Sequence, residues 1–104
     1  MSKIDFESAK MILNTVPDDK MFIGRDGTVF RCLEDLPTGI KVLGQDMFNY
    51  HVTPSKNDFA TWIYNVIGDV KLAEDIGPIK EMNPMIKKIK ARITQLKKKI
   101  SKGA

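Results

Sequence analysis

The amino-acid sequence predicts an α+β domain that is mostly helical, with one β-hairpin packed on short helices and a long basic helix at its C-terminus. Three observations predict this fold class. Apolar residues recur at helical spacings, an Asp-Gly pair separates two short β-type runs, and an isoleucine-rich heptad pattern occupies the last part of the chain. At 104 residues the chain is one ordinary domain. We expect a compact body over residues 1–80 and a basic amphipathic helix over residues 81–104.

The start of the chain predicts a helix followed by a hairpin. Residues 4–16 carry apolar side chains mostly at helical spacings, and Pro17 ends the helix because a residue before proline avoids helical backbone angles. The apolar runs 21–23 and 28–30 then flank a turn that contains Asp26-Gly27. Asp-Gly tolerates the positive φ angles of a tight turn, so these runs predict a β-hairpin. A hairpin of this size requires helices to pack on.

A second, interrupted helical stripe covers residues 34–43. Pro37 is compatible with a helix only in its first turn, and Gly39 weakens the pattern further. Gly44 is expected to end this helix, after which Asp46 caps a short turn.

The clearest helical pattern begins after Ser55. Ser55 and Asp58 resemble a capping box, and Gly68 is expected to end the helix. Asp69 then caps another short helix, and Asn83-Pro84 opens the C-terminal one. The predicted core comprises Ile12, Leu13, Phe22, Val29, Leu36, Phe59, Trp62, Ile63, Val66, Ile67, Leu72 and Ile76.

Charge is distributed unevenly along the chain. Residues 84–104 hold eight Lys or Arg and no Asp or Glu, whereas residues 1–83 hold nine bases and thirteen acids. The body is therefore mildly acidic, and the high isoelectric point comes from the predicted C-terminal helix alone.

The apolar residues of that helix follow a heptad a/d pattern, which we call the seam. Its flanking positions are mostly lysine or arginine, so like charges would oppose each other in a two-helix homodimer, and homodimerisation through this helix alone is disfavoured. The seam comprises Ile86, Ile89, Ile93, Leu96 and Ile100.

Three uses of this helix stay open. The seam can pack on the acidic body and leave a solvated lysine face, or that face can bind the phosphates of nucleic acid or a ribonucleoprotein. Alternatively, the helix can dock on an acidic protein partner or an anionic membrane surface. We expect a non-enzymatic binding module that contacts nucleic acid, with a protein-interaction or assembly module using the seam as the alternative. The predicted nucleic-acid contacts are Lys87, Lys88, Lys90, Arg92, Lys97, Lys98 and Lys99.

The sequence contains little that indicates catalysis. It has no nucleophile motif, glycine-rich phosphate loop or metal-ligand spacing, so we expect no catalytic residue, cofactor or metal. His51 with Asn57 and Asp58 is the one cluster that resembles a general acid/base pair. Because helix capping explains Asp58, a structural role for His51 is favoured.

The expected location is the cytoplasm. The single cysteine, Cys32, excludes an internal disulfide and suits a reducing compartment. No apolar run approaches the roughly 20 residues of a membrane-spanning helix, and the first ten residues lack the apolar stretch of a signal peptide.

A set of short motifs is spread over residues 9–76. They are 16–22 (VPDDKMF), Asp26-Gly27, 33–36, His51-Val52, 57–63 (NDFATWI) and Gly68-Asp69. Together they resemble the pattern of a small archaeal domain family that has no assigned activity, so the resemblance implies a shared fold and no particular reaction. This chain departs from the family pattern at Pro37 and Gly39, and its basic helix lies outside the matched region.

Overall fold

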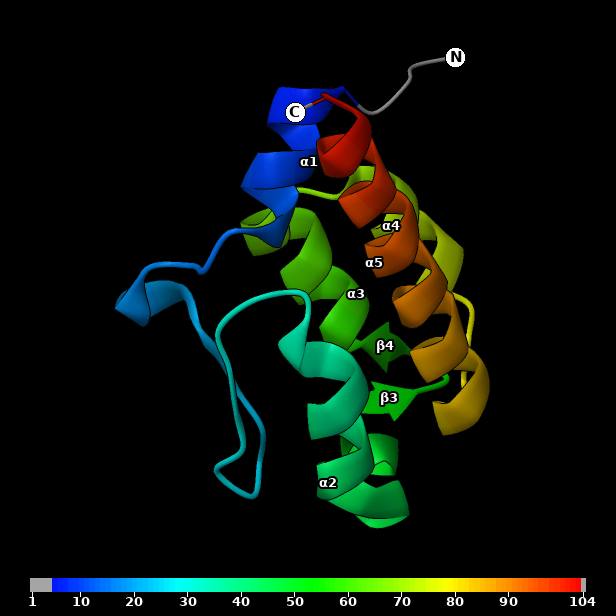
Figure 1. The fold of residues 1–104 in the computed structure, drawn as a ribbon. Coiled ribbons are helices and arrows are strands. Elements are labelled where there is room, and N and C mark those ends of the chain that lie inside the picture. The colour runs from blue at the N-terminus through cyan, green and yellow to red at the C-terminus, as the bar shows by residue number, and fades with distance from the viewer. Residues whose placement is uncertain (1–4, 104) are drawn as a thin grey trace.

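Five α-helices and two short antiparallel hairpins form residues 5–103, the part of the chain that the computed structural model describes (Figure 1). The α+β, mostly helical fold class is confirmed. In chain order the elements are α1 (Phe6–Leu13), a 3-10 turn (Asp18–Lys20), β1 (Phe22–Ile23), β2 (Val29–Phe30), α2 (Asp35–His51), β3 (Val52–Thr53), β4 (Lys56–Asn57), α3 (Asp58–Trp62), a π-helical segment (Ile63–Ile67), α4 (Val70–Ile76) and α5 (Met82–Gly103).

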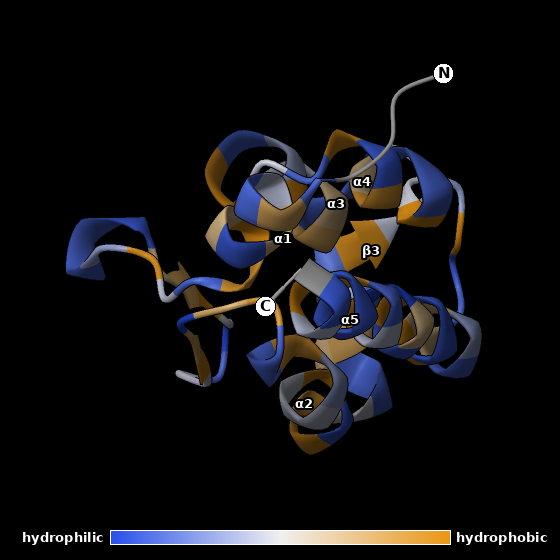
Figure 2. Ribbon diagram, turned by 45° about the horizontal axis from the view of Figure 1, so that its top comes forward, coloured by the Kyte–Doolittle hydropathy of each residue, from blue (hydrophilic) through white to orange (hydrophobic). Residues whose placement is uncertain are grey.

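Helix α5 packs along the body rather than projecting from it. It lies against α1, α2 and α4, and Figure 2 shows it between α2 on one side and α1 and α4 on the other. Met85, Ile89 and Leu96 are completely buried in this interface. The two segments predicted as body and C-terminal helix therefore share one hydrophobic core.

The predicted hairpin is present, with Phe22 paired to Phe30 and Ile23 paired to Val29. Phe30 points inward and is completely buried, whereas Val29 is 40% exposed, so the prediction of Val29 as a core residue is wrong. Successive residues of a strand face opposite sides. The paired residues Phe22 and Phe30 face the core, so the paired residues Ile23 and Val29 face solvent. The Phe22 ring packs edge-on against Phe30 and stacks on Phe59, with centroids 5.4 and 5.1 Å apart.

The other predicted core residues lie inside or at the edge of the core. Leu13, Phe22 and Val66 are partly buried and pack against it. The buried ones are Ile12, Leu36, Phe59, Trp62, Ile63, Ile67, Leu72 and Ile76.

Helix α2 changes course at Gly44, whose φ of 82° lies in the left-handed region that glycine tolerates. The helix predicted over 34–43 thus ends where expected, and a second helical stretch follows directly instead of an Asp46-capped turn. Pro37 lies in the first turn, where its missing N–H costs little. Gly39 lies against the buried ring of Phe30.

The second hairpin, β3–β4, was not predicted, and it moves the start of α3. Ser55 lies in the hairpin turn, and Asn57 is the residue that caps α3, since its side-chain oxygen accepts the Ala60 N–H at 3.1 Å. The predicted Ser55–Asp58 capping box is therefore corrected. The Asn57 amide also donates to the Ile76 carbonyl at 3.0 Å, which ties the start of α3 to the end of α4.

The remaining helix ends agree with the sequence pattern within a few residues. Gly68 ends the π-helical segment with a φ of 87°, and Asp69 caps α4 by accepting the Leu72 N–H at 3.2 Å. Asp5 caps α1, which ends at Leu13, short of Pro17. The predicted first residue of that helix lies outside the described residues.

Candidate nucleic-acid interface

The outer face of α5 is an array of lysines. With 3.6 residues per turn, the apolar seam faces the body and the intervening positions face solvent. Figure 2 shows this alternation of hydrophobic and hydrophilic residues along the helix. The exposed lysines, which we call the lysine face, are Lys87, Lys88, Lys90, Lys97, Lys98, Lys99 and Lys102.

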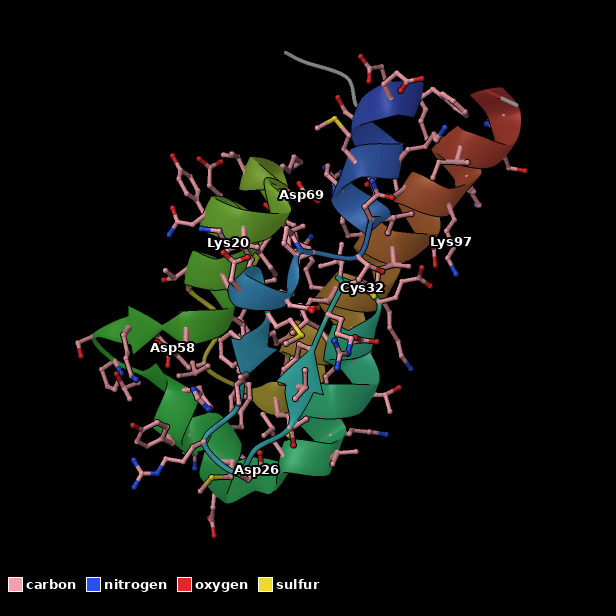
Figure 3. The ribbon with its side chains drawn as sticks, turned by 90° about the vertical axis from the view of Figure 1, so that its left-hand side faces the viewer. Lys20, Asp26, Cys32, Asp58, Asp69 and Lys97 are labelled. Atoms are coloured by element: carbon pink, nitrogen blue, oxygen red, sulfur yellow. The ribbon has the colours of Figure 1, made fainter. Side chains whose placement is uncertain are left out.

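The lysine face contains six of the seven predicted contacts and adds Lys102. Sequence reasoning omitted Lys102 although the same spacing extends to it. Lys97 forms a 2.7 Å salt bridge to Glu34 of the segment before α2, with 58% of its side chain exposed. Exposed ion pairs contribute only about 0–1 kcal/mol, so this bridge leaves Lys97 able to exchange Glu34 for a phosphate. Figure 3 shows Lys97 far from the hairpin turn at Asp26.

Arg92 does not belong to this face. Its side chain is only 6% exposed, with Nε donating to Asp69 Oδ2 at 2.7 Å and Nη2 donating to Asp69 Oδ1 at 2.9 Å. Nη1 donates to Gln95 Oε1 at 2.9 Å. Because these donors are engaged inside the protein, the prediction of Arg92 as a nucleic-acid contact is corrected.

The seam is occupied by the chain itself. Ile86, Ile89, Ile93 and Leu96 are buried, and Ile100 is partly buried against the same core. Packing of the seam on the body is therefore observed, and it agrees both with a solvated lysine face and with a lysine face that binds nucleic acid. A protein partner could reach Ile89, Ile93 and Leu96 only by displacing α5 from α1, α2 and α4.

Of the cluster His51, Asn57 and Asp58, the structure brings His51 and Asp58 together, whereas Asn57 caps α3. His51 Nδ1 lies 2.9 Å from Asp58 Oδ2, and Nε2 accepts the backbone N–H of Arg25 at 3.1 Å. An acceptor role for Nε2 places the proton on Nδ1, which donates to the carboxylate. Both ring nitrogens are thus engaged, and His51 links the β1–β2 turn to the start of α3.

The surface around this link is basic and aromatic. Arg25 and Lys56 both lie over the Tyr50 ring, at 4.6 and 4.8 Å from its centroid. Lys56 also donates to Asp58 at 3.0 Å. Partial burial raises the pKa of Asp58, but the hydrogen bonds from His51 and Lys56 outweigh it and hold the pKa below its ordinary value. These contacts fasten the hairpin tip to the end of α2.

Other reactive groups show no assembled site in the described part of the chain. Burial raises the pKa of the Cys32 thiol, and the negative charge of Asp35 adds to this, so the thiol stays protonated. Among residues 5–103, no three His, Cys, Asp or Glu side chains gather closely enough to hold a metal ion. Within the same residues, no helix combines the length and the apolar character that crossing a membrane requires.

Comparisons with protein-family models, with curated proteins and with solved structures yield no significant match. The resemblance to a small archaeal domain family therefore rests on its motifs alone and stays a prediction.

Proposed function

We propose that this protein is a small, non-enzymatic, cytoplasmic module that binds nucleic acid, free or within a ribonucleoprotein, through the lysine face of α5. The observation that supports it most directly is a helix with seven exposed lysines and no acidic residue, held in place by a buried apolar seam. Lysine ammonium groups are compact point charges that pair well with phosphates.

The dimensions of the lysine face suit a phosphate backbone. Lys87 and Lys98 are eleven residues apart, which corresponds to about 16 Å along an α-helix. One strand of duplex DNA carries a phosphate roughly every 3.4 Å, so this distance spans about five phosphates. Binding of this kind releases counterions, depends steeply on salt and carries little sequence preference.

The alternative explanation is a face that is merely solvated. That explanation would be supported if acidic side chains of the body neutralised the lysines of α5. Within residues 5–103, however, the bridge from Lys97 to Glu34 is the one ion pair that an exposed lysine of α5 forms. The other lysines of this face keep their charge available to a polyanion. Binding in this mode would also be non-catalytic, because phosphate contacts alone supply no reaction.

A charge-neutralising variant tests the proposal better than a truncation. A chain ending at Glu81 would lose Ile89 and Leu96 from the core and unfold for reasons unrelated to binding. Fluorescence anisotropy with mixed-sequence RNA and DNA should therefore compare three full-length proteins across a salt series. They are the wild type, the variant Lys87→Gln/Lys88→Gln/Lys98→Gln, and the matched control Lys10→Gln/Lys20→Gln/Lys71→Gln.

The two variants lose the same charge from different places. We expect the wild type and the control to bind with similar salt slopes, and the α5 variant to bind more weakly with a log–log slope smaller by about 2 to 3. Equal weakening in both variants would show that net charge, not the lysine face, governs binding. The absence of any binding at low salt would refute the proposal.

A further inference from the structure

A groove of about 250 Å³ lies between α2 and α5, next to the lysine face. The two helices pack against each other, and Lys90 belongs both to the groove and to the lysine face. The six residues that line the groove are Pro37, Thr38, Lys41, Val42, Ile86 and Lys90.

The lining combines positive charge with apolar surface. Lys41 from α2 and Lys90 from α5 contribute the charge, and none of the six lining residues is acidic. Val42 is 67% exposed at the same groove, so it offers apolar surface to a ligand held between the lysines of the two helices. Such a surface complements a ligand that carries both phosphates and apolar groups.

The size of the groove narrows the choice of ligand. Pockets that enclose a small molecule are usually about 300–1,000 Å³, and this open groove is below that range. A segment of a longer chain can cross it while the rest of that chain contacts the lysine face. A nucleic-acid duplex keeps its bases stacked inside the helix, whereas a single strand can place an unpaired base or sugar against an apolar side chain.

We propose that the α2–α5 groove binds one unpaired nucleotide of a single-stranded nucleic acid. Lys41 and Lys90 contact its phosphates, and Val42 packs against its base or sugar. This inference rests on the proposed function and extends the interface from α5 onto α2. It makes Lys41 a contact residue, and it makes the protein prefer single strands over duplexes of the same sequence.

The test is fluorescence anisotropy with a labelled mixed-sequence single-stranded RNA and with the duplex formed from it. Lys41→Gln and Val42→Ser alter the groove, and Lys20→Gln, in the 3-10 turn Asp18–Lys20, is the control for charge. All three side chains are exposed, so the variants should fold, and thermal unfolding would verify this.

We expect the wild type to bind the single strand more tightly than the duplex. Lys41→Gln should weaken single-strand binding roughly three-fold and lower the salt slope by about 0.7, the value of one phosphate contact. Val42→Ser should weaken single-strand binding roughly three-fold and leave duplex binding unchanged. Lys20→Gln should change neither.

The outcomes separate this inference from the proposed function. The groove inference would be wrong if the wild type bound single strand and duplex with equal affinity. It would also be wrong if Lys41→Gln and Val42→Ser bound the single strand as tightly as Lys20→Gln does. In both cases the lysine face would remain a binding surface. If the wild type shows no salt-dependent binding to either nucleic acid, both the groove inference and the proposed function are wrong.

Discussion

Asp69 at the start of α4 and Arg92 in the middle of α5 form a buried, two-point ion pair. Arg92 Nε and Nη2 donate to the two carboxylate oxygens at 2.7 and 2.9 Å, and the side chains are 6% and 1% exposed for Arg92 and Asp69. The same Asp69 carboxylate accepts the Leu72 N–H and so caps α4. One side chain therefore starts a helix and holds the long basic helix against it.

Removing Arg92 should be among the most destabilising single changes in the chain. Arg92→Met keeps an apolar stem in place but leaves the Asp69 carboxylate buried without its counter-charge. Breaking such a pair by removing one partner typically costs about 3–5 kcal/mol. Urea unfolding followed by circular dichroism would measure the loss, and a cost below about 1 kcal/mol would show that the pair is not a main contact between α4 and α5.

A double variant separates the buried charge from the helix cap. Asn at position 69 can still accept the Leu72 N–H, since asparagine is a good capping residue, yet it carries no charge. Asp69→Asn combined with Arg92→Met should therefore be clearly more stable than Arg92→Met alone. If the two proteins unfold at the same urea concentration, the loss comes from missing packing rather than from an unpaired charge.

The burial of Arg92 could not be inferred from the sequence. The heptad pattern places it at a position that flanks the seam, where charged residues usually face solvent. Asp69 was recognised as a helix cap, but nothing in the local sequence indicates which distant residue its second oxygen meets. The partner is decided by how α4 packs on α5, and no local pattern encodes that arrangement.

Features that depend on residues close together in the sequence were predictable. The apolar stripe of residues 59–67, the stop at Gly68 and the Asp26-Gly27 hairpin all follow from periodicity or from backbone preferences. The β3–β4 hairpin was missed because strands of two residues carry no period, and Ser55, Asn57 and Asp58 are all good capping residues. Tertiary hydrogen bonds, not propensity, select Asn57.

The candidate interface was predictable to a similar degree. Charge counting located the lysine face on the last helix, whereas the groove that Lys41 forms with Lys90 depends on α2 lying beside α5. Sequence alone left open whether the seam faced the body or a partner.

Replacing His51 should loosen the first hairpin. His51→Leu removes the acceptor for the Arg25 N–H and leaves that partly buried donor unsatisfied, at an expected cost of about 1–3 kcal/mol. Asp58 loses its hydrogen bond from His51 but keeps the one from Lys56, so it contributes less to the loss of stability than the Arg25 N–H does. Hydrogen exchange measured by NMR should show faster exchange of the Arg25 amide in the variant. Unchanged exchange would mean that the β1–β2 turn is held by other contacts.

Tyr50→Leu is the control for this change, because Tyr50 precedes His51 and is 44% exposed. It removes the aromatic face under Arg25 and Lys56 but keeps the histidine bonds. Exposed cation–π contacts are worth about 0.5–1 kcal/mol, so the loss should be smaller than for His51→Leu.

The stability of the protein should depend on Asp58 in acid. Partial burial raises its pKa, yet the hydrogen bonds from His51 and Lys56 leave the folded pKa below the ordinary 3.8. As the pH falls, the unfolded chain takes up this proton first, so the contribution of Asp58 is present above about pH 3.8 and is lost as the pH falls through the folded pKa. Asp58→Asn should therefore show a flatter dependence of unfolding free energy on pH below about pH 4.

Urea unfolding at a series of acidic pH values would measure this slope. Glu81→Gln, which removes an exposed carboxylate far along the chain from His51, is the matched control for charge. Parallel curves for the wild type and Asp58→Asn would contradict the assignment of Asp58 as a contributor to acid sensitivity.

Gly39→Ala tests why a glycine lies inside α2. Alanine is favoured over glycine within a helix by about 0.8–1.0 kcal/mol, so helix propensity alone predicts stabilisation. A Cβ at this position would instead overlap the ring of Phe30, which is completely buried. Overpacking of this kind costs about 1–3 kcal/mol, so we expect a net loss of stability in urea unfolding.

Two further variants establish that the Phe30 ring is the cause. Thr38→Ala, at the preceding exposed position, should be neutral or slightly stabilising because only helix propensity changes there. In a Phe30→Leu background the ring is absent, so Gly39→Ala should lose its cost and stabilise the helix. If Gly39→Ala is equally costly with and without the Phe30 ring, the strain comes from the backbone of α2. The close approach of Phe30 would then be a consequence of the glycine and not the reason for it.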